Sequence, residues 1–355
     1  MAMTTAFVST NYLATALLPS IAQTQSTLSN LEVEASTGQY ANIGLQLGDQ
    51  SGYELSLKNE NDLLQTLTGS NGLVTTSLQT SQAALDSIRS DAQNAMQSLT
   101  EWASTEVNSG ATLQSVGVNA LQSLIATTNT TSNGQYIFGG INSSVAPMAD
   151  YFSSTTSAAK TAIDTAFQTA FGCLPTDAAA STITASQMQS FLSGAFAAQF
   201  SGANWTSNWS SASSTNPTAQ IAPDETIDAS TNANQPGFQQ LAEGYAMLAE
   251  FGGSQLSSSA RQAVASAANS MIAQGVTSIT QTEADVGAAL KRVSDANSSM
   301  SSQMTILQTQ IGNLDNVDSA AVAAQINALS TQLQTAYELT AQLQKLSLAQ
   351  YLPIA

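Results

Sequence analysis

The sequence predicts a mainly α-helical protein whose long N- and C-terminal helices pair as a coiled-coil rod bundle, with a short β-hairpin and a small inserted α+β middle domain. Apolar residues recur at alternating spacings of three and four near both ends of the chain, which indicates helices that pack along one another. Aromatic residues make up only 6% of the 355 residues, so Ala and Leu must dominate the packing, as in long helices. The middle of the chain has a different composition, which favours a separate domain there.

The first predicted helix covers residues 1–37, where the apolar spacings form one seam along the helix. Pro19 interrupts this seam, so we expect a kink or an extended start at that point. Four glycines between residues 38 and 52 then predict a turning linker.

A second seam covers residues 64–102, and a helix of that length would be a rod of about 58 Å at 1.5 Å per residue. Gly110 ends this rod, and residues 113–127 are expected to form a shorter helix. We predict a β-hairpin at residues 133–141, because β-prone residues lie there between glycine turns.

The C-terminal half repeats the helical pattern over residues 236–312, and Asp318 is the expected N-cap of a last helix. Neither end could bury its apolar stripe alone, so the N- and C-terminal helices are expected to pack together. Two polar residues, Asn71 and Asn297, fall on the seams, where they either fix the register or face solvent. The residues expected to pack the rods are Leu64, Leu67, Val74, Leu78, Leu85, Ile88, Leu290, Val293, Met300 and Leu307.

The middle of the chain holds nine of the 21 aromatic residues. It predicts two short helices, near residues 156–171 and 184–200, in a small domain with an aromatic core of its own. The chain is expected to divide into three parts. They are residues 1–52 with 315–355 as terminal helices, residues 53–144 with 236–314 as the rod, and residues 145–235 as the inserted domain.

The composition excludes several classes of function. The chain carries 24 acidic against seven basic residues, a net charge of −17, which disfavours nucleic acid and anionic membranes as partners. It has no histidine and one cysteine, which rules out Ser-His-Asp and Cys-His catalysis, zinc sites of the His/Cys type and an intrachain disulfide. A hard cation held by oxygen ligands stays open. No apolar run approaches the roughly 20 residues of a membrane span, so no membrane insertion is expected.

No set of residues predicts a catalytic, cofactor-binding or metal site. Ser157 and Lys160 match the pattern S-x-x-K, but the companion motifs of that chemistry are missing. Trp205 and Trp209 either belong to a domain core or stack on a sugar. The second reading leaves a surface carbohydrate-binding protein as an alternative of another class.

Three segments are similar to the flagellin superfamily. They are Leu28–Gln39, the hairpin with Asn133-Gly134 and Phe138-Gly139-Gly140, and the tail Tyr337–Leu352. More narrowly, the chain resembles the hook-associated protein 3 family, the hook–filament junction proteins, in its alphaproteobacterial form. The segments that carry this narrower resemblance are residues 42–48, 138–142, 150–152, 204–210 and 230–234.

The resemblance implies a structural subunit of the bacterial flagellum, without catalysis or cofactors, that serves as the adaptor between hook and filament. A flagellin subunit of the filament itself is the alternative. It also implies an extracellular location, reached through the flagellar type III channel without a cleaved signal peptide. Expected partners are copies of the chain itself, another hook-associated protein, flagellin and an export chaperone. The residues expected to carry assembly are Leu17, Ile21, Leu28, Leu31, Ile326, Leu329, Leu333, Leu343 and Leu346.

Overall fold

The computed structural model describes residues 10–104, 109–153 and 157–349. Most of these residues are helical, and their strands form two two-stranded sheets, which confirms the predicted mainly α-helical fold. The chain divides into two compact units, residues 1–63 with 302–355 and residues 64–301. The finer division into three parts stays a prediction.

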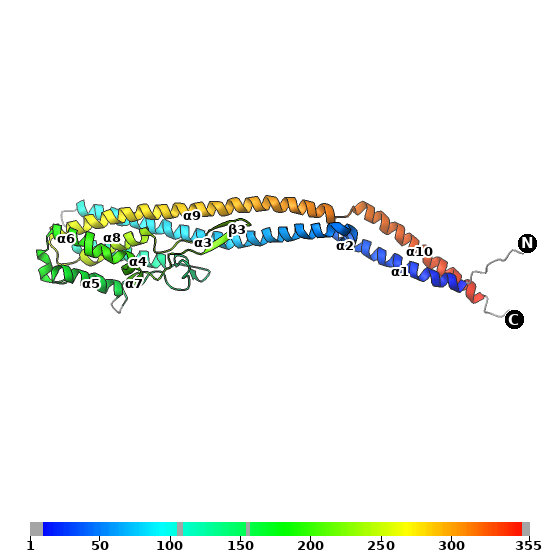
Figure 1. Ribbon diagram of the computed structural model, residues 1–355, viewed down its shortest axis with the longest axis horizontal. Helices are drawn as coiled ribbons and strands as arrows, with labels where there is room; N and C mark the ends of the chain where they lie inside the picture. Colours follow the sequence, from blue (N-terminus) through cyan, green and yellow to red (C-terminus); the bar gives the residue numbers. More distant parts are fainter. Residues whose placement is uncertain (1–9, 105–108, 154–156, 350–355) are drawn as a thin grey trace, which may run out of the picture. The chain divides into compact units, whose positions relative to one another are not determined.

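The longest helices come from the two ends of the chain, and the shorter elements come from the middle (Figure 1). The helices are α1 (Thr10–Thr37), α2 (Ile43–Leu47), α3 (Ser51–Ser104), α4 (Gly110–Thr128), α5 (Ala158–Phe171), α6 (Ala185–Phe191), α7 (Gly202–Asn208), α8 (Pro236–Phe251), α9 (Ser258–Asp315) and α10 (Ser319–Ala349). The 3-10 and π segments are η1 (Gly48–Gln50), η2 (Ala178–Thr182), η3 (Leu192–Phe196) and η4 (Ala197–Phe200). The strands are β1 (Thr131–Ser132), β2 (Gln135–Tyr136), β3 (Thr218–Ala222) and β4 (Glu225–Asp228).

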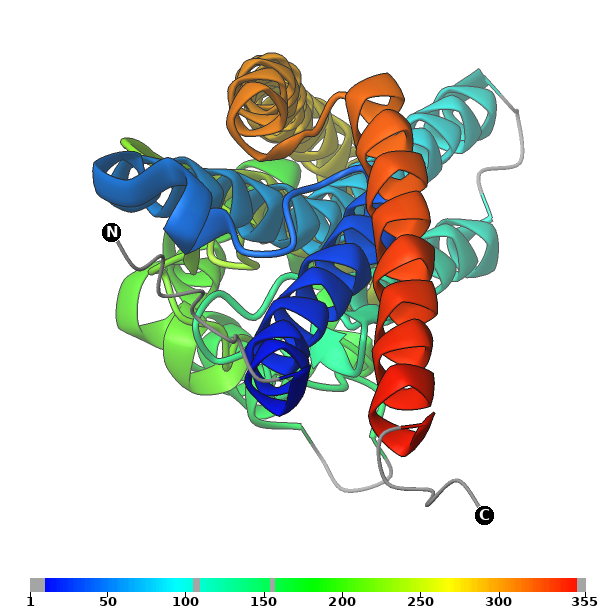
Figure 2. The same cartoon turned by 90° about the vertical axis from the view of Figure 1, so that its right-hand side faces the viewer.

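In the first unit, α1 and α10 pack against each other. Figure 1 and Figure 2 both show them side by side, in blue and red. α1 continues through Pro19, so the expected extended start is not seen in the described residues. The predicted N-cap of α10 is confirmed, because Asp318 Oδ1 accepts a hydrogen bond from Ala320 N over 2.9 Å.

In the second unit, α3 and α9 run side by side in opposite directions (Figure 1). Their apolar seam is buried, and an ion pair between Arg89 Nε and Glu283 Oε2, at 3.1 Å, joins them at its edge. α3 begins at Ser51, well before the predicted residue 64. The predicted helix was too short because the glycines nearby indicated a linker. In the structure the apolar seam continues through Leu57, which is buried.

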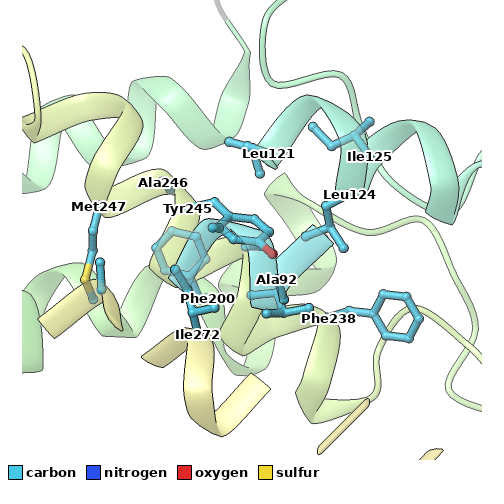
Figure 3. Packing of buried hydrophobic residues seen from close by; sticks show 14 of the residues in the cluster. Ala92, Leu121, Leu124, Ile125, Phe200, Phe238, Tyr245, Ala246, Met247 and Ile272 are labelled. Atoms are coloured by element: carbon cyan, nitrogen blue, oxygen red, sulfur yellow. The ribbon is translucent and has the colours of Figure 1, made fainter. Parts of the chain in front are cut away.

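In the second unit, α4 and α8 pack against each other (Figure 3). They approach so closely at Gly117 that a Cβ atom there would lie 2.4 Å from Ala249 N. Figure 3 shows Leu121 and Leu124 of α4 next to Tyr245 of α8, and all three side chains are buried. The absence of a side chain at one position therefore sets the spacing of this helix pair.

The aromatic side chains of the middle region pack against α8. Phe167, Phe191 and Phe196 surround Phe251, with ring centroids 5.4, 5.9 and 5.4 Å from it. The buried cluster continues from these rings into α3 and α9. The expectation of an aromatic core closed within the middle region is therefore wrong, because α8 supplies part of that core.

A β-hairpin forms close to the predicted residues 133–141, but it lies earlier in the chain, because β1 precedes this range and Asn133-Gly134 is the turn. β1 and β2 pair in antiparallel fashion around Asn133 and Gly134, whose φ angles are 52° and 77°, as Asn-Gly turns require. The β3–β4 ribbon was not predicted, because Pro217 and Pro223 indicated an irregular return. Each of its strands buries one isoleucine, Ile221 and Ile227 respectively.

Candidate assembly surface

The α1–α10 pair has a narrow buried stripe. Of the side chains predicted to carry assembly, Ile21 and Leu31 are buried, and five others are only partly buried. These five are Leu17, Leu28, Ile326, Leu329 and Leu333. The side chains of Leu343 and Leu346 lie outside the described part of the structure. Gln25 Nε2 of α1 donates a side-chain hydrogen bond to Tyr337 OH of α10.

Large apolar side chains are exposed mainly on the first unit. Among the described residues, nine of the 13 exposed large hydrophobic side chains belong to it, although the second unit is much larger. Leu45 is 86% exposed, and Leu18 is 60% exposed. The nine are Leu18, Val33, Leu45, Tyr53, Leu55, Leu63, Ile306, Tyr337 and Leu339. This concentration makes the first unit the candidate region for contact with another copy or another protein.

The same unit carries few charges on its terminal helices. α1 contains two charged residues, Glu32 and Glu34, and α10 contains Glu338 and Lys345. The net charge of the chain is −17, so copies of the chain repel one another elsewhere. Contact through these helices brings few like charges together, which favours association there.

The sequence did not single out the exposed residues outside the terminal seam. Leu45, Leu55 and Leu63 lie off the seam, and the periodic pattern selects only residues that face another helix of the same chain. Leu45 also follows Gly44, which indicated a loop. The signal that the sequence did contain was a leucine at a position off the apolar seam.

The predicted rod residues lie along the α3–α9 seam. Seven of them are buried and three are partly buried. The buried ones are Leu64, Leu78, Leu85, Ile88, Val293, Met300 and Leu307. The partly buried ones are Leu67, Val74 and Leu290. Their role in holding the rod stays a prediction that mutation can test.

The two seam asparagines are joined to each other. Asn71 is fully buried, and its Nδ2 donates hydrogen bonds to Asn297 Oδ1 over 2.7 Å and to Ile221 O over 2.8 Å. Of the two readings of this pair, the contact supports register control, because it ties one position of α3 to one position of α9 and to β3.

Three sequence segments of the middle region meet in one hydrogen-bonded network. Asn234 Oδ1 accepts from Trp205 Nε1 over 2.9 Å and from the Ser210 hydroxyl over 2.7 Å. The backbone of Ala233 donates to Phe138 O over 2.9 Å. Residues 138–142, 204–210 and 230–234 therefore form a single structural element, although they lie far apart in the sequence.

The residues that resembled catalytic or sugar-binding motifs have structural partners. Ser157 is the N-cap of α5, and Lys160 Nζ forms an ion pair with Glu250 at 2.6 Å. Trp205 and Trp209 are each 1% exposed, and their rings stack with centroids 5.9 Å apart. Neither ring is available to stack on a sugar, so the carbohydrate-binding reading of these two residues is wrong.

The described residues contain neither a membrane-spanning helix nor a cluster of metal ligands. Within residues 10–104, 109–153 and 157–349, no helix is long and apolar enough to cross a membrane. In the same ranges, no group of three or more His, Cys, Asp and Glu side chains is placed to hold a metal ion. The exposed apolar side chains of the first unit are therefore the candidate for a functional surface in the described structure.

Comparisons with known proteins agree with this description. The bacterial flagellin N-terminal helical region matches residues 8–143, and the bacterial flagellin C-terminal helical region matches residues 269–352. No curated protein sequence matches the chain.

A solved structure from Vibrio parahaemolyticus, assigned as a flagellar hook-associated protein, has a similar fold. The TM-score is 0.51 at 11% sequence identity, and the match covers 75% of this chain and 97% of the other. The two flagellin regions together cover more than half of the chain and include all of α1, α3 and α10 and most of α9. The chain belongs to the flagellin superfamily and is a structural subunit of the bacterial flagellum.

Proposed function

We propose that this chain is the adaptor that joins the flagellar hook to the filament, and that it assembles with copies of itself through α1 and α10. In this role it is exported, with an export chaperone as a partner, and contacts a second hook-associated protein and flagellin. Its action is mechanical and needs neither catalysis nor a cofactor.

Self-assembly is supported by the surface of the first unit. Nine large apolar side chains are exposed there, and the terminal helices carry only four charged residues. A neighbouring copy that covers this surface would remove apolar area from water, at about 25 cal/mol per Å².

The junction role is supported by one observation. The segments 138–142, 204–210 and 230–234, which resemble the junction family, meet in the hydrogen-bonded network around Asn234. Because these residues hold one another in place, the resemblance concerns a complete structural element rather than scattered matches. The solved Vibrio protein of similar fold is itself assigned as hook-associated.

The proposal is tested by electron microscopy of a strain that lacks the gene for this chain. Loss of an adaptor leaves hooks without filaments and releases unassembled flagellin into the medium. A complementing wild-type copy restores filaments. Filaments of normal length in the deletion strain would contradict the proposal. Bare hooks with no flagellin in the medium would support the alternative, a filament subunit.

Two variants test whether the α1–α10 stripe contributes to assembly. Leu31→Asp places a charge in the narrow α1–α10 stripe, whereas Asn30→Asp places one on the exposed face of α1. The first variant is expected to abolish filament attachment, and the matched second variant is expected to retain it. Equal behaviour of the two variants would show that the stripe does not carry assembly.

A further inference from the structure

The two chain segments that connect the helices of the first unit are paired with each other. α1 ends at Thr37 and α9 ends at Asp315. Between the two ends, Gln39 and Asn316 form an antiparallel bridge. Tyr40 N donates to Asp315 O, and Val317 N donates to Gly38 O, each over 2.9 Å. We call residues 38–41 and 315–317 together the joint.

The conformation of the joint depends on its first residue. Gly38 has a φ of 73°, in the left-handed region that favours glycine. Its N–H donates to Glu34 O over 2.8 Å, which closes the last turn of α1. The Glu34 carboxylate then accepts from Ala41 N over 3.2 Å. Both strands of the joint are thus held by backbone contacts that would open together.

A buried carboxylate lies at the centre of the joint. The Asp315 side chain has no exposed area, and it stands at the C-terminal end of α9, where the helix dipole disfavours a negative charge. Asp315 Oδ2 lies 2.7 Å from Lys58 Nζ. Among the described residues, Lys58 is the one cation within ion-pair distance of it.

Lys58 pairs with a second carboxylate at the same time. Glu54 lies one turn earlier on α3, its side chain is 9% exposed, and its carboxylate contacts Lys58 Nζ. The hydrogen bonds to Asp315 and then to Glu54 raise the pKa of Lys58 above its usual value. One ammonium group therefore balances two nearly buried carboxylates on two different helices.

We propose that Glu54, Lys58 and Asp315 form a charge lock that holds the joint closed, so that the Tyr40 and Val317 amide hydrogen bonds open only when the lock is broken. Without the cation, two buried negative charges face each other, and separating α3 from the joint lets water reach both. The lock goes beyond the proposed function, since it concerns the free chain and requires no partner.

Hydrogen exchange at the Tyr40 and Val317 amides of the full-length free subunit tests the lock. Lys58→Met keeps the length of the side chain and removes its charge. We expect exchange at both amides to become at least about tenfold faster, because the variant leaves two nearly buried carboxylates without their cation. Lys291→Met is the matched control, because Lys291 pairs with Asp295 at 2.8 Å but both side chains are well exposed.

A rescue variant separates charge from packing. In the triple variant Glu54→Gln, Lys58→Met, Asp315→Asn, no charge remains in the lock. We expect exchange at Tyr40 and Val317 to be slower in this variant than in Lys58→Met alone. Exchange in Lys58→Met equal to that of the wild type, or a triple variant that exchanges as fast as Lys58→Met, would overturn the proposal.

Discussion

Asn71 of α3 donates a hydrogen bond to Asn297 of α9 across the seam of the rod, over 2.7 Å, and is itself fully buried. A second bond from the same amide reaches Ile221 O of β3. A one-residue slip of α3 would break both bonds, and a slip of α9 would break the bond between the two asparagines. Either slip would leave a polar group in an apolar seam. The pair therefore specifies one register among those that the apolar pattern alone would allow.

Asn71→Ala is expected to reduce the free energy of unfolding by about 1–3 kcal/mol, because Ile221 O and Asn297 Oδ1 lose their donor. Urea unfolding of the single variants and of Asn71→Ala with Asn297→Ala gives the coupling energy of the pair. Asn94→Ala, on the exposed face of α3, is the control and should change stability little. Additive effects at positions 71 and 297 would contradict the register role.

Gly117→Ala is expected to destabilise the second unit by about 1–3 kcal/mol, because the added methyl group overlaps the backbone of α8. Gly287→Ala is the matched control. It also lies inside a helix, but nothing lies within 4 Å of its added Cβ, so it should stabilise the protein by about 0.5–1 kcal/mol. Thermal unfolding compares the two. Equal effects at both glycines would show that α4 and α8 are farther apart.

Stability is expected to fall with rising pH through one buried carboxyl group. Glu243 is 7% exposed, and burial raises its pKa from 4.5 to about 7. Between these values the folded chain holds a proton that the unfolded chain has lost, so the free energy of unfolding decreases as the pH rises from 4.5 to 7.

Glu243→Gln should remove this part of the pH dependence and stabilise the protein at pH 8 by about 1–3 kcal/mol. Urea unfolding at pH 5 and pH 8 measures it. Glu101→Gln, at an exposed position of α3, should leave the pH dependence as it is. If the difference between pH 5 and pH 8 were the same in Glu243→Gln and the wild type, Glu243 would not be the group responsible.

The terminal helices are expected to be the least stable part of the free subunit. Among their described side chains, only Ile21, Leu31 and Val322 are buried apolar groups, which is little against roughly 1–2 kcal/mol of backbone entropy per residue. Limited proteolysis of the monomer should trim both ends and stop near the joint, at about residues 38 and 318. Mass spectrometry identifies the fragments. Ends that resist the protease in a verified monomer would contradict this expectation.

The sequence predicts the helices of this fold better than its polar contacts. The seam of α3 and α9 was visible because many residues repeat one spacing, and the N-cap of α10 was visible from Asp318 alone. The β3–β4 ribbon was missed because its two short strands bury only Ile221 and Ile227, too few positions for an alternating pattern.

The candidate sites also differ in how far the sequence predicts them. The residues of the α1–α10 stripe can be predicted from the apolar repeat, because each lies at a regular spacing from the next one in the sequence. The charge lock joins Lys58 to Asp315, which are distant in sequence, so no local pattern predicts it. The spacing of Glu54 and Lys58, one helical turn apart, was the part of the lock that the sequence contains.

The central claim, that the chain is the adaptor between hook and filament, is tested most directly by its location. Immunogold electron microscopy of intact flagella uses an antibody against this chain, adsorbed beforehand on cells of a strain that lacks its gene. If the chain is the adaptor, gold particles will be confined to a short zone where the hook meets the filament. Gold distributed along the whole filament would contradict it and identify the chain as a filament subunit.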